Sequence, residues 1–195
     1  MSLKEEPKTF DAKTRKDWRK WLEKNHAKEK TIWLIIYRKD SKKVSVSYEE
    51  AVEEALCFGW IDSKAVKHDP ESHLQSFAPR KPKSNWSKPN RERVAKMIKA
   101  GLMTPAGQAT IDLAKKTGTW TALEKVERLE IPVDLQKLFD KNKTAQKNFL
   151  AFPPSSKKMI LEWIMTAKKP ETRKQRVENT VELAAKNSRA HHPAK

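Results

Sequence analysis

The sequence predicts an α+β protein in which a small N-terminal sheet of a few strands, with its helices, is followed by a C-terminal helical bundle. Two observations predict this class. Runs rich in β-branched and aromatic residues occur only before Pro89. After that proline, apolar residues recur at helical spacing behind capping residues. We therefore expect an α+β domain over residues 1–88 and a helical domain over residues 89–195.

The first predicted elements are a helix and a strand. Residues 1–9 are expected to be disordered. A helix over residues 13–24 is predicted because three apolar side chains fall on one face, namely Trp18, Trp21 and Leu22. The apolar run over residues 31–38 is rich in β-branched and aromatic side chains, so it predicts a central strand.

A second helix and a hairpin follow. Ser47 and Glu50 form a capping box, since each side chain can bond the backbone amide of the other residue. The helix that they open is expected to end at Gly59, which can adopt the left-handed conformation of a helix terminus. Beyond this glycine, residues 60–68 and 73–79 predict two strands joined by a turn.

The second half of the chain predicts helices from their start and stop signals. One helix is expected to begin at Arg91, after a proline-rich segment. Thr104 followed by Pro105 is typical of a helix start, and Gly118 closes that helix. Thr121 begins another capping box. Further helices are predicted to begin at Pro132, Ser155 and Glu171, and residues 187–195 are expected to form a frayed tail.

The charge of the chain is strongly positive. Its 42 lysines and arginines against 25 aspartates and glutamates give a net charge of +17. Such a field attracts nucleic acid, anionic lipid or acidic partners, although it also serves plain solubility. Clusters are more informative than the total. One spans residues 80–99, with eight basic residues and one acidic residue, and another spans residues 168–176.

Cysteine usage and hydropathy indicate the compartment. Cys57 is the only cysteine, so no disulfide can form within the chain and a reducing environment is expected. No apolar run is long enough to predict a membrane span or a secretory signal. We therefore expect a soluble, cytoplasmic protein.

Several chemistries find no support in the sequence. No nucleophile elbow is present, and Cys57 is expected to be buried on a helix face. Asp62, His68, Asp69 and His73 match no standard metal-ligand spacing, so no metal site is expected. The four glycines cannot build a phosphate-binding loop, and no cofactor is predicted. The glutamates at 49, 50, 53 and 54 are interpreted as the exposed face of a helix.

The proline-rich basic segment carries the candidate site. Its prolines stiffen the backbone, while short polar side chains, lysines and a tryptophan suit a phosphate or a polyanion. If Arg80 lies beside Asp62 on the adjacent strand, an ion pair would orient the guanidinium toward an anion. A solvated connector between domains is the alternative. The candidate ligand-binding residues are Trp60, Asp62, Arg80, Lys83, Ser84, Trp86, Arg173 and Arg176.

Several motifs in the chain resemble a known family. They lie at residues 47–63, 77–87 and 101–107, and a C-terminal signature runs from Ala167 to Arg176. With these motifs the chain resembles the bacterial and archaeal YdeI or OmpD-associated proteins, described as bacteriocin-protection proteins. The resemblance implies a link to survival under antimicrobial peptides and a C-terminal helical region over residues 131–190. It implies no catalytic residues, and the protection would be indirect.

The leading hypothesis is a non-enzymatic protein of stress or bacteriocin-protection type whose basic clusters bind an anionic ligand, either nucleic acid or phosphate. Two alternatives stay open. An enzyme would act on a small phosphorylated or carboxylated substrate, with Asp62 as base or orienting group and Arg80 as anion clamp. A peripheral protein would dock its cationic surface on an anionic membrane without spanning it. No catalytic residue and no oligomeric state are assigned.

Overall fold

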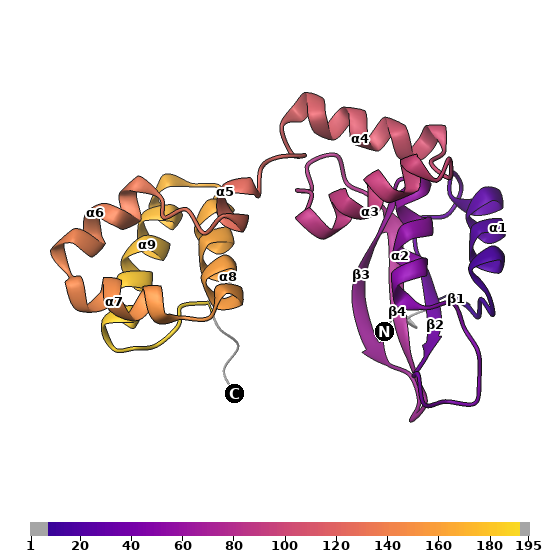
Figure 1. Cartoon of the computed structure of the whole chain (residues 1–195), viewed down its shortest axis with the longest axis horizontal. Coiled ribbons are helices and arrows are strands. Elements are labelled where there is room, and N and C mark those ends of the chain that lie inside the picture. Colours follow the sequence, from indigo (N-terminus) through magenta and orange to yellow (C-terminus); the bar gives the residue numbers. More distant parts are fainter. Residues whose placement is uncertain (1–7, 192–195) are drawn as a thin grey trace, which may run out of the picture. The chain divides into compact units, whose positions relative to one another are not determined.

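The computed structural model describes residues 8–191 and confirms the α+β class (Figure 1). Its contacts divide the chain into two compact units, Met1–Ala122 and Leu123–Lys195, which we call unit 1 and unit 2. The predicted boundary between residues 88 and 89 falls inside unit 1. Two helices beyond that point pack onto the sheet-bearing unit, because they complete its hydrophobic core: α3 (Lys88–Lys99) and α4 (Pro105–Thr117).

Unit 1 is built on a four-stranded sheet in the order β1-β2-β4-β3. The strands are β1 (Thr9–Phe10), β2 (Ile32–Tyr37), β3 (Trp60–Lys67) and β4 (Ser72–Pro79). β1 runs parallel to β2, and the other neighbours are antiparallel. The expectation of disorder is therefore wrong for Thr9, which pairs with Trp33, while residues 1–7 lie outside the described part of the chain.

Two helices cover one face of this sheet. They are α1 (Arg15–Asn25) and α2 (Tyr48–Cys57), and each opens with a complete capping box. Alternate residues of β2, beginning with Ile32, point into the core that these helices bury. Trp18 and Leu22 of α1 are fully buried there, which confirms their predicted role. α3 and α4 gather at one end of the strands, opposite the β3–β4 turn (Figure 1).

The interpretation of the α2 glutamates as an exposed face is wrong for two of them. Glu53 and Glu54 are buried, because α2 is enclosed by α1, α3, α4 and the sheet. Arg15 donates to both carboxylates at 2.9 and 2.6 Å. Arg19 adds a bond to Glu54 at 2.7 Å, and Lys96 of α3 adds one to Glu53 at 2.6 Å. These ion pairs therefore join three helices.

A close approach between α2 and α4 explains the glycine-containing motif at residues 101–107. The Thr104 hydroxyl donates to the Cys57 carbonyl at 2.6 Å, which satisfies the carboxyl end of α2. A Cβ on Gly107 would lie 2.3 Å from that carbonyl oxygen, so only glycine fits. Gly59 ends α2 with a φ of 74°, as predicted.

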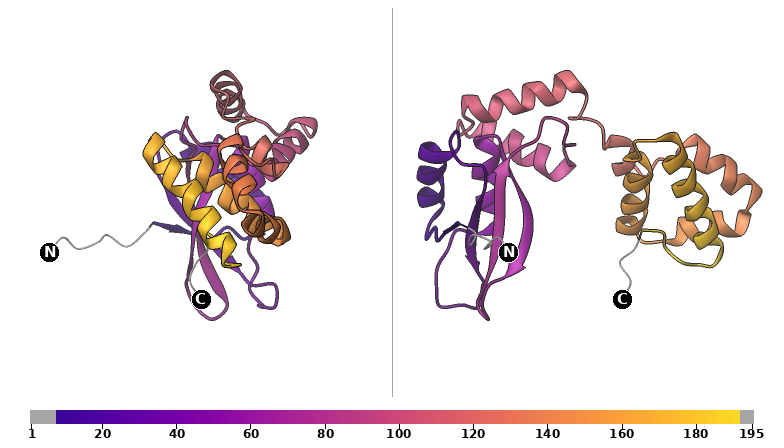
Figure 2. Two further views of the ribbon diagram at one scale, coloured as in Figure 1. Left: turned by 90° about the vertical axis from the view of Figure 1, so that its left-hand side faces the viewer. Right: turned by 180° about the vertical axis from the view of Figure 1, so that it is seen from behind.

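Unit 2 is wholly helical in the residues described. Its helices are α5 (Glu124–Glu127), α6 (Val133–Lys141), α7 (Lys143–Ala151), α8 (Pro154–Met165) and α9 (Pro170–Ala185). α9 lies against α6, α7 and α8 (Figure 2). Phe139 and Phe149 pair at 5.1 Å within the core. The separate helix α7 was not predicted.

The starts of α3 and α5 and the C-terminal tail differ from the sequence prediction. α3 begins at Lys88 rather than Arg91, because Pro89 is tolerated in the first helical turn. α5 begins at Glu124 with Leu123 at its N-cap, so the helix does not start at the capping box predicted from Thr121. The predicted frayed tail is packed as far as it is described: Ala190 is buried and His191 stacks on Trp163 at 5.0 Å. Residues 192–195 lie outside the described range.

None of the helices within residues 8–191 has the length and apolar character needed to cross a membrane.

Candidate anion-binding site

Residues 80–87 link β4 to α3, and we call them the basic loop. Both ends of the loop are bonded to other segments of unit 1. The Arg80 amide donates to the Gly59 carbonyl at 2.9 Å, and the Trp86 amide donates to the Thr119 carbonyl at 3.1 Å. Within the loop, Ser84 Oγ donates to the Lys81 carbonyl at 2.9 Å. Hydrogen bonds to unit 1 therefore anchor the loop at both ends.

Trp86, which the sequence analysis names as a candidate ligand-binding residue, does not lie at the surface. Its side chain is 1% exposed and belongs to the core of unit 1. Its ring meets Trp120 at a centroid distance of 5.0 Å, because the loop folds back onto the end of α4. A buried ring cannot stack on a ligand, so Trp86 supports the site from beneath.

The guanidinium of Arg80 makes few polar contacts. Its guanidinium lies 3.9 Å from the centroid of the Trp86 ring, and its Nη2 donates to the Asn85 carbonyl. Its Nε is buried and makes no hydrogen bond within residues 8–191. Burial lowers the pKa of Arg80 to about 10, although the charge of Asp62 acts in the opposite direction. Arg80 is therefore a charged group at neutral pH that lacks a bonded counter-ion.

The predicted ion pair between Asp62 and Arg80 does not form. The sheet register sets Phe77 opposite Asp62, so Arg80 lies further along, beside Gly59. Asp62 instead accepts a 2.8 Å hydrogen bond from the Tyr48 hydroxyl. Burial and this hydrogen bond raise the pKa of Tyr48 to about 12. The geometry required by the enzyme alternative, an anion clamp oriented by a bonded carboxylate, is therefore not present.

The other predicted ligand-binding residues of unit 1 lie in different environments. Trp60 is 1% exposed, and its indole N–H donates to the His26 carbonyl at 3.1 Å, so it is part of the core. Lys81 and Lys83 are exposed and make no ion pair in the part of the chain that the structure describes. Arg80, Lys81 and Lys83 thus form a short run of cations on a loop that is anchored at both ends.

Sequence reasoning missed Trp120, which supports the basic loop from the end of α4. It is half-buried against Trp86, and Lys115 lies 5.6 Å above its ring. The Arg91 guanidinium donates to its carbonyl at 3.2 Å. No local sequence signal marks this role, because it depends on a contact between segments more than thirty residues apart.

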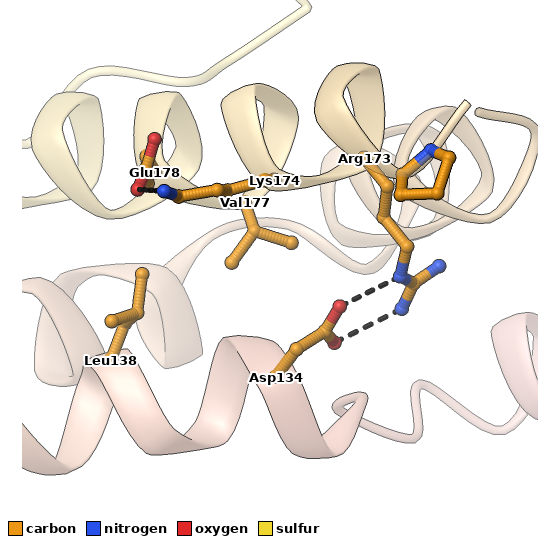
Figure 3. Close-up of a pocket in the computed structure, with 7 residues that line it drawn as sticks. Asp134, Leu138, Arg173, Lys174, Val177 and Glu178 are labelled. Carbon is orange, nitrogen blue, oxygen red and sulfur yellow. Dashed lines mark hydrogen bonds and ion pairs between the residues drawn. The ribbon is translucent and has the colours of Figure 1, made fainter. Parts of the chain in front are cut away.

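Arg173 and Arg176, the predicted ligand residues of unit 2, are both bonded inside that unit. Arg173 makes a two-pronged ion pair with Asp134 of α6, with distances of 2.7 and 3.0 Å (Figure 3). This bond lowers the pKa of the Asp134 carboxyl. Arg176 donates to the Trp163 carbonyl and stands 5.0 Å from the centroid of the Trp163 ring. Their role in ligand binding stays a prediction.

A pocket of about 290 Å³ lies between α6 and α9 of unit 2. Leu138 and Val177 face each other across it, and the Asp134–Arg173 pair closes one side (Figure 3). Glu178 pairs with Lys174 at 3.9 Å on the other side. Since its charged groups are already paired, this pocket offers no free cation to an anionic ligand.

Cys57 and the metal-ligating residue types offer no further site. Burial raises the pKa of the Cys57 thiol to about 11, so it is protonated at neutral pH and is not a nucleophile. Within residues 8–191, no group of three histidines, cysteines or carboxylates is placed to hold a metal ion.

Two protein-family models match the chain. Residues 10–110 match the model described as a domain of unknown function, DUF8412. Residues 128–187 match the model described as bacteriocin-protection, YdeI or OmpD-associated. No curated protein and no solved structure matches the chain.

The first match covers more than half of the chain, which therefore belongs to the family defined by this domain of unknown function. Residues 128–187 are similar to the bacteriocin-protection family, which confirms the resemblance for that part of the chain, whereas the motifs at residues 47–63, 77–87 and 101–107 fall in the first match. The basic loop and the glycine motif fall in the first match, whereas Arg173 and Arg176 fall in the second.

Proposed function

We propose that this chain is a non-enzymatic, cytoplasmic binding protein whose basic loop holds the phosphates of a nucleic acid. The observation that carries the proposal is Arg80, a half-buried cation with no bonded carboxylate, beside two unpaired lysines. Of its donors, Nη1 makes no hydrogen bond in the described residues and is not buried, so it is open to an anion. The single, buried cysteine fits a reducing compartment.

Physical chemistry favours a polyanion over a cationic peptide as the ligand. A chain with a net charge of +17 repels cationic peptides and attracts phosphates. Arginine and lysine on a fixed backbone neutralise phosphates without reading bases, so affinity would depend little on sequence. In this proposal, protection against bacteriocins is indirect.

The test is a salt series of fluorescence anisotropy with labelled single- and double-stranded oligonucleotides. The variant is Lys81→Ala/Lys83→Ala, which removes two exposed charges without touching the core. We expect it to bind more weakly and to lose about two units of the logarithmic salt slope. The matched control is Lys28→Ala/Lys30→Ala, which removes two exposed charges elsewhere in unit 1.

Equal losses in both double variants would mean that only total charge matters, and would contradict a site in the basic loop. Binding that does not weaken with salt would contradict phosphate recognition. Tighter binding to vesicles of anionic lipid than to any oligonucleotide, lost in the same loop variant, would assign the loop to a membrane surface instead.

A further inference from the structure

The four-stranded sheet has a second face that the core of unit 1 does not use. Side chains alternate between the faces of a strand, and Ile32, Leu34 and Ile36 of β2 enter the core. The residues between them therefore point to the opposite face. Trp33 and Ile35 are half-buried and belong to neither hydrophobic cluster of the described residues.

This outer face is apolar across three strands. Ile35 pairs with Leu74 of β4, which in turn pairs with Val66 of β3. Leu74 is 7% exposed, whereas Val66 is 42% exposed. Such a connected apolar surface on a highly charged chain is typical of an interaction site.

Trp33 differs from the core tryptophans of unit 1. Trp18 and Trp60 donate their indole N–H groups to backbone carbonyls and are almost fully buried. In the part of the chain that is described, the Trp33 indole has neither a hydrogen bond nor a paired ring. The Trp33 side chain is thus partly exposed on the sheet and lacks the contacts that fix the core tryptophans.

Cations surround the hairpin end of this face. Lys13 and Lys43 stand 5.5 and 5.4 Å from the centroid of the Tyr37 ring, which points outward from β2. Each of these lysines also has a carboxylate partner, Asp11 and Glu71 respectively. Two further cations near this end have no ion pair in residues 8–191, namely Lys39 and Lys64.

Two cavities lie at this end of the outer face. One, of about 290 Å³, is lined by Tyr37, Lys39 and Lys43 among others. The other, of about 390 Å³, includes Val66 and Lys67 in its lining, together with Asp69. The outward strand residues in the middle of the face include no carboxylate.

We propose that the outer sheet face, centred on Trp33 and Ile35, binds the unpaired bases of a single-stranded nucleic acid. Exposed aromatic and apolar side chains on a sheet stack on bases, and flanking lysines neutralise the phosphates between them. A second copy of the chain fits less well, because two chains of net charge +17 repel each other. The surface is separate from the basic loop, and only the class of ligand rests on the proposed function.

The test compares a single-stranded oligonucleotide with the duplex of the same sequence, using Trp33→Val and Trp33→Phe. Valine keeps the strand preference of the position but removes the aromatic face. We expect Trp33→Val to lower single-strand affinity by about five-fold or more and to change duplex affinity less than two-fold. Trp33→Phe is expected to keep most of the single-strand affinity. Thermal unfolding of each variant reports whether the sheet is intact.

The basic-loop proposal and the sheet-face proposal are tested by different measured quantities. The loop variant Lys81→Ala/Lys83→Ala changes binding to single strands and duplexes alike, whereas the sheet face is tested by the ratio of the two affinities. An unchanged ratio in a folded Trp33→Val protein would overturn the sheet-face proposal. So would sedimentation that shows a dimer which Trp33→Val converts to a monomer while oligonucleotide binding is unchanged.

Discussion

At the scale of single residues, Arg80 is the residue whose environment differs most from an ordinary surface arginine. It covers the Trp86 ring but has no carboxylate bonded to it. Its lowered pKa means that the folded state disfavours the charged form, so the charge itself works against stability. A charge that weakens the fold is expected where function requires it.

This environment gives a prediction for Arg80→Met. Methionine retains an apolar stem over Trp86 and removes the charge, so we expect the free energy of unfolding in urea to stay equal or to rise. Oligonucleotide affinity is expected to fall by several-fold, because one phosphate contact is lost. A variant that unfolds more easily while binding nucleic acid as tightly as before would show that Arg80 has a structural role alone.

At the scale of elements, Arg173 joins three helices of unit 2. It binds Asp134 near the start of α6, and its Nη1 reaches the Ile164 carbonyl near the end of α8 at 3.4 Å. Arg176 bonds the preceding carbonyl, that of Trp163. Both arginines thereby satisfy carbonyl groups that the end of a helix leaves without internal partners.

We therefore predict that Arg173→Ala destabilises unit 2 by about 1–3 kcal/mol, since it leaves a partly buried carboxylate and a helix end without their partner. Lys174→Ala is the matched control on the same helix. Lys174 is 77% exposed and pairs only loosely with Glu178, so its removal should cost less than about 0.5 kcal/mol. Chemical unfolding measures the free energy of unfolding of both variants. Equal stabilities of Arg173→Ala and Lys174→Ala would contradict the role of Arg173 in joining the three helices.

At the scale of the whole molecule, both units depend on carboxylates with lowered pKa values. Burial alone would raise the pKa of Glu53, but Lys96 and Arg15 outweigh it, so the value is lowered. The hydrogen bond from Arg173 lowers the pKa of Asp134. Because these groups are more acidic in the folded state, their stabilisation is complete above the unfolded pKa of about 4 and is lost as pH falls through the folded value.

We predict that the free energy of unfolding falls as the pH is lowered from 5 to 3. Urea unfolding at a series of pH values measures it, and Glu53→Gln should flatten the part of this dependence that belongs to unit 1. Added salt separates this effect from the general repulsion of a +17 chain, since salt screens surface charges more than buried pairs. Constant stability across this range would contradict the role given to these ion pairs.

Local patterns predicted most elements of this fold, whereas the site depended on contacts that no local pattern contains. The capping box at Ser47 and the left-handed Gly59 could be read directly, because both act within one turn. The burial of Trp86 and Glu53 could not, since each is enclosed by segments distant in sequence. The strand β1 could not be predicted either, because it pairs with β2 over only two residues.

The organisation into units also depended on distant contacts. The loss of strand patterns after Pro89 is real, but α3 and α4 belong with the sheet because their apolar faces complete its core. The outer face of the sheet was missed for a related reason. The run over residues 31–38 looked continuously apolar, and only the register separates the core residues from the accessible ones.

The most direct test of the central claim is an NMR titration of the isotopically labelled 195-residue chain with a single-stranded oligonucleotide. Amide and indole N–H signals report contacts residue by residue. We predict that the largest shifts occur at residues 80–87 and at the Trp33 indole, while the signals around Arg173 change little. Shifts confined to unit 2, or none at moderate salt, would contradict a nucleic-acid site on unit 1.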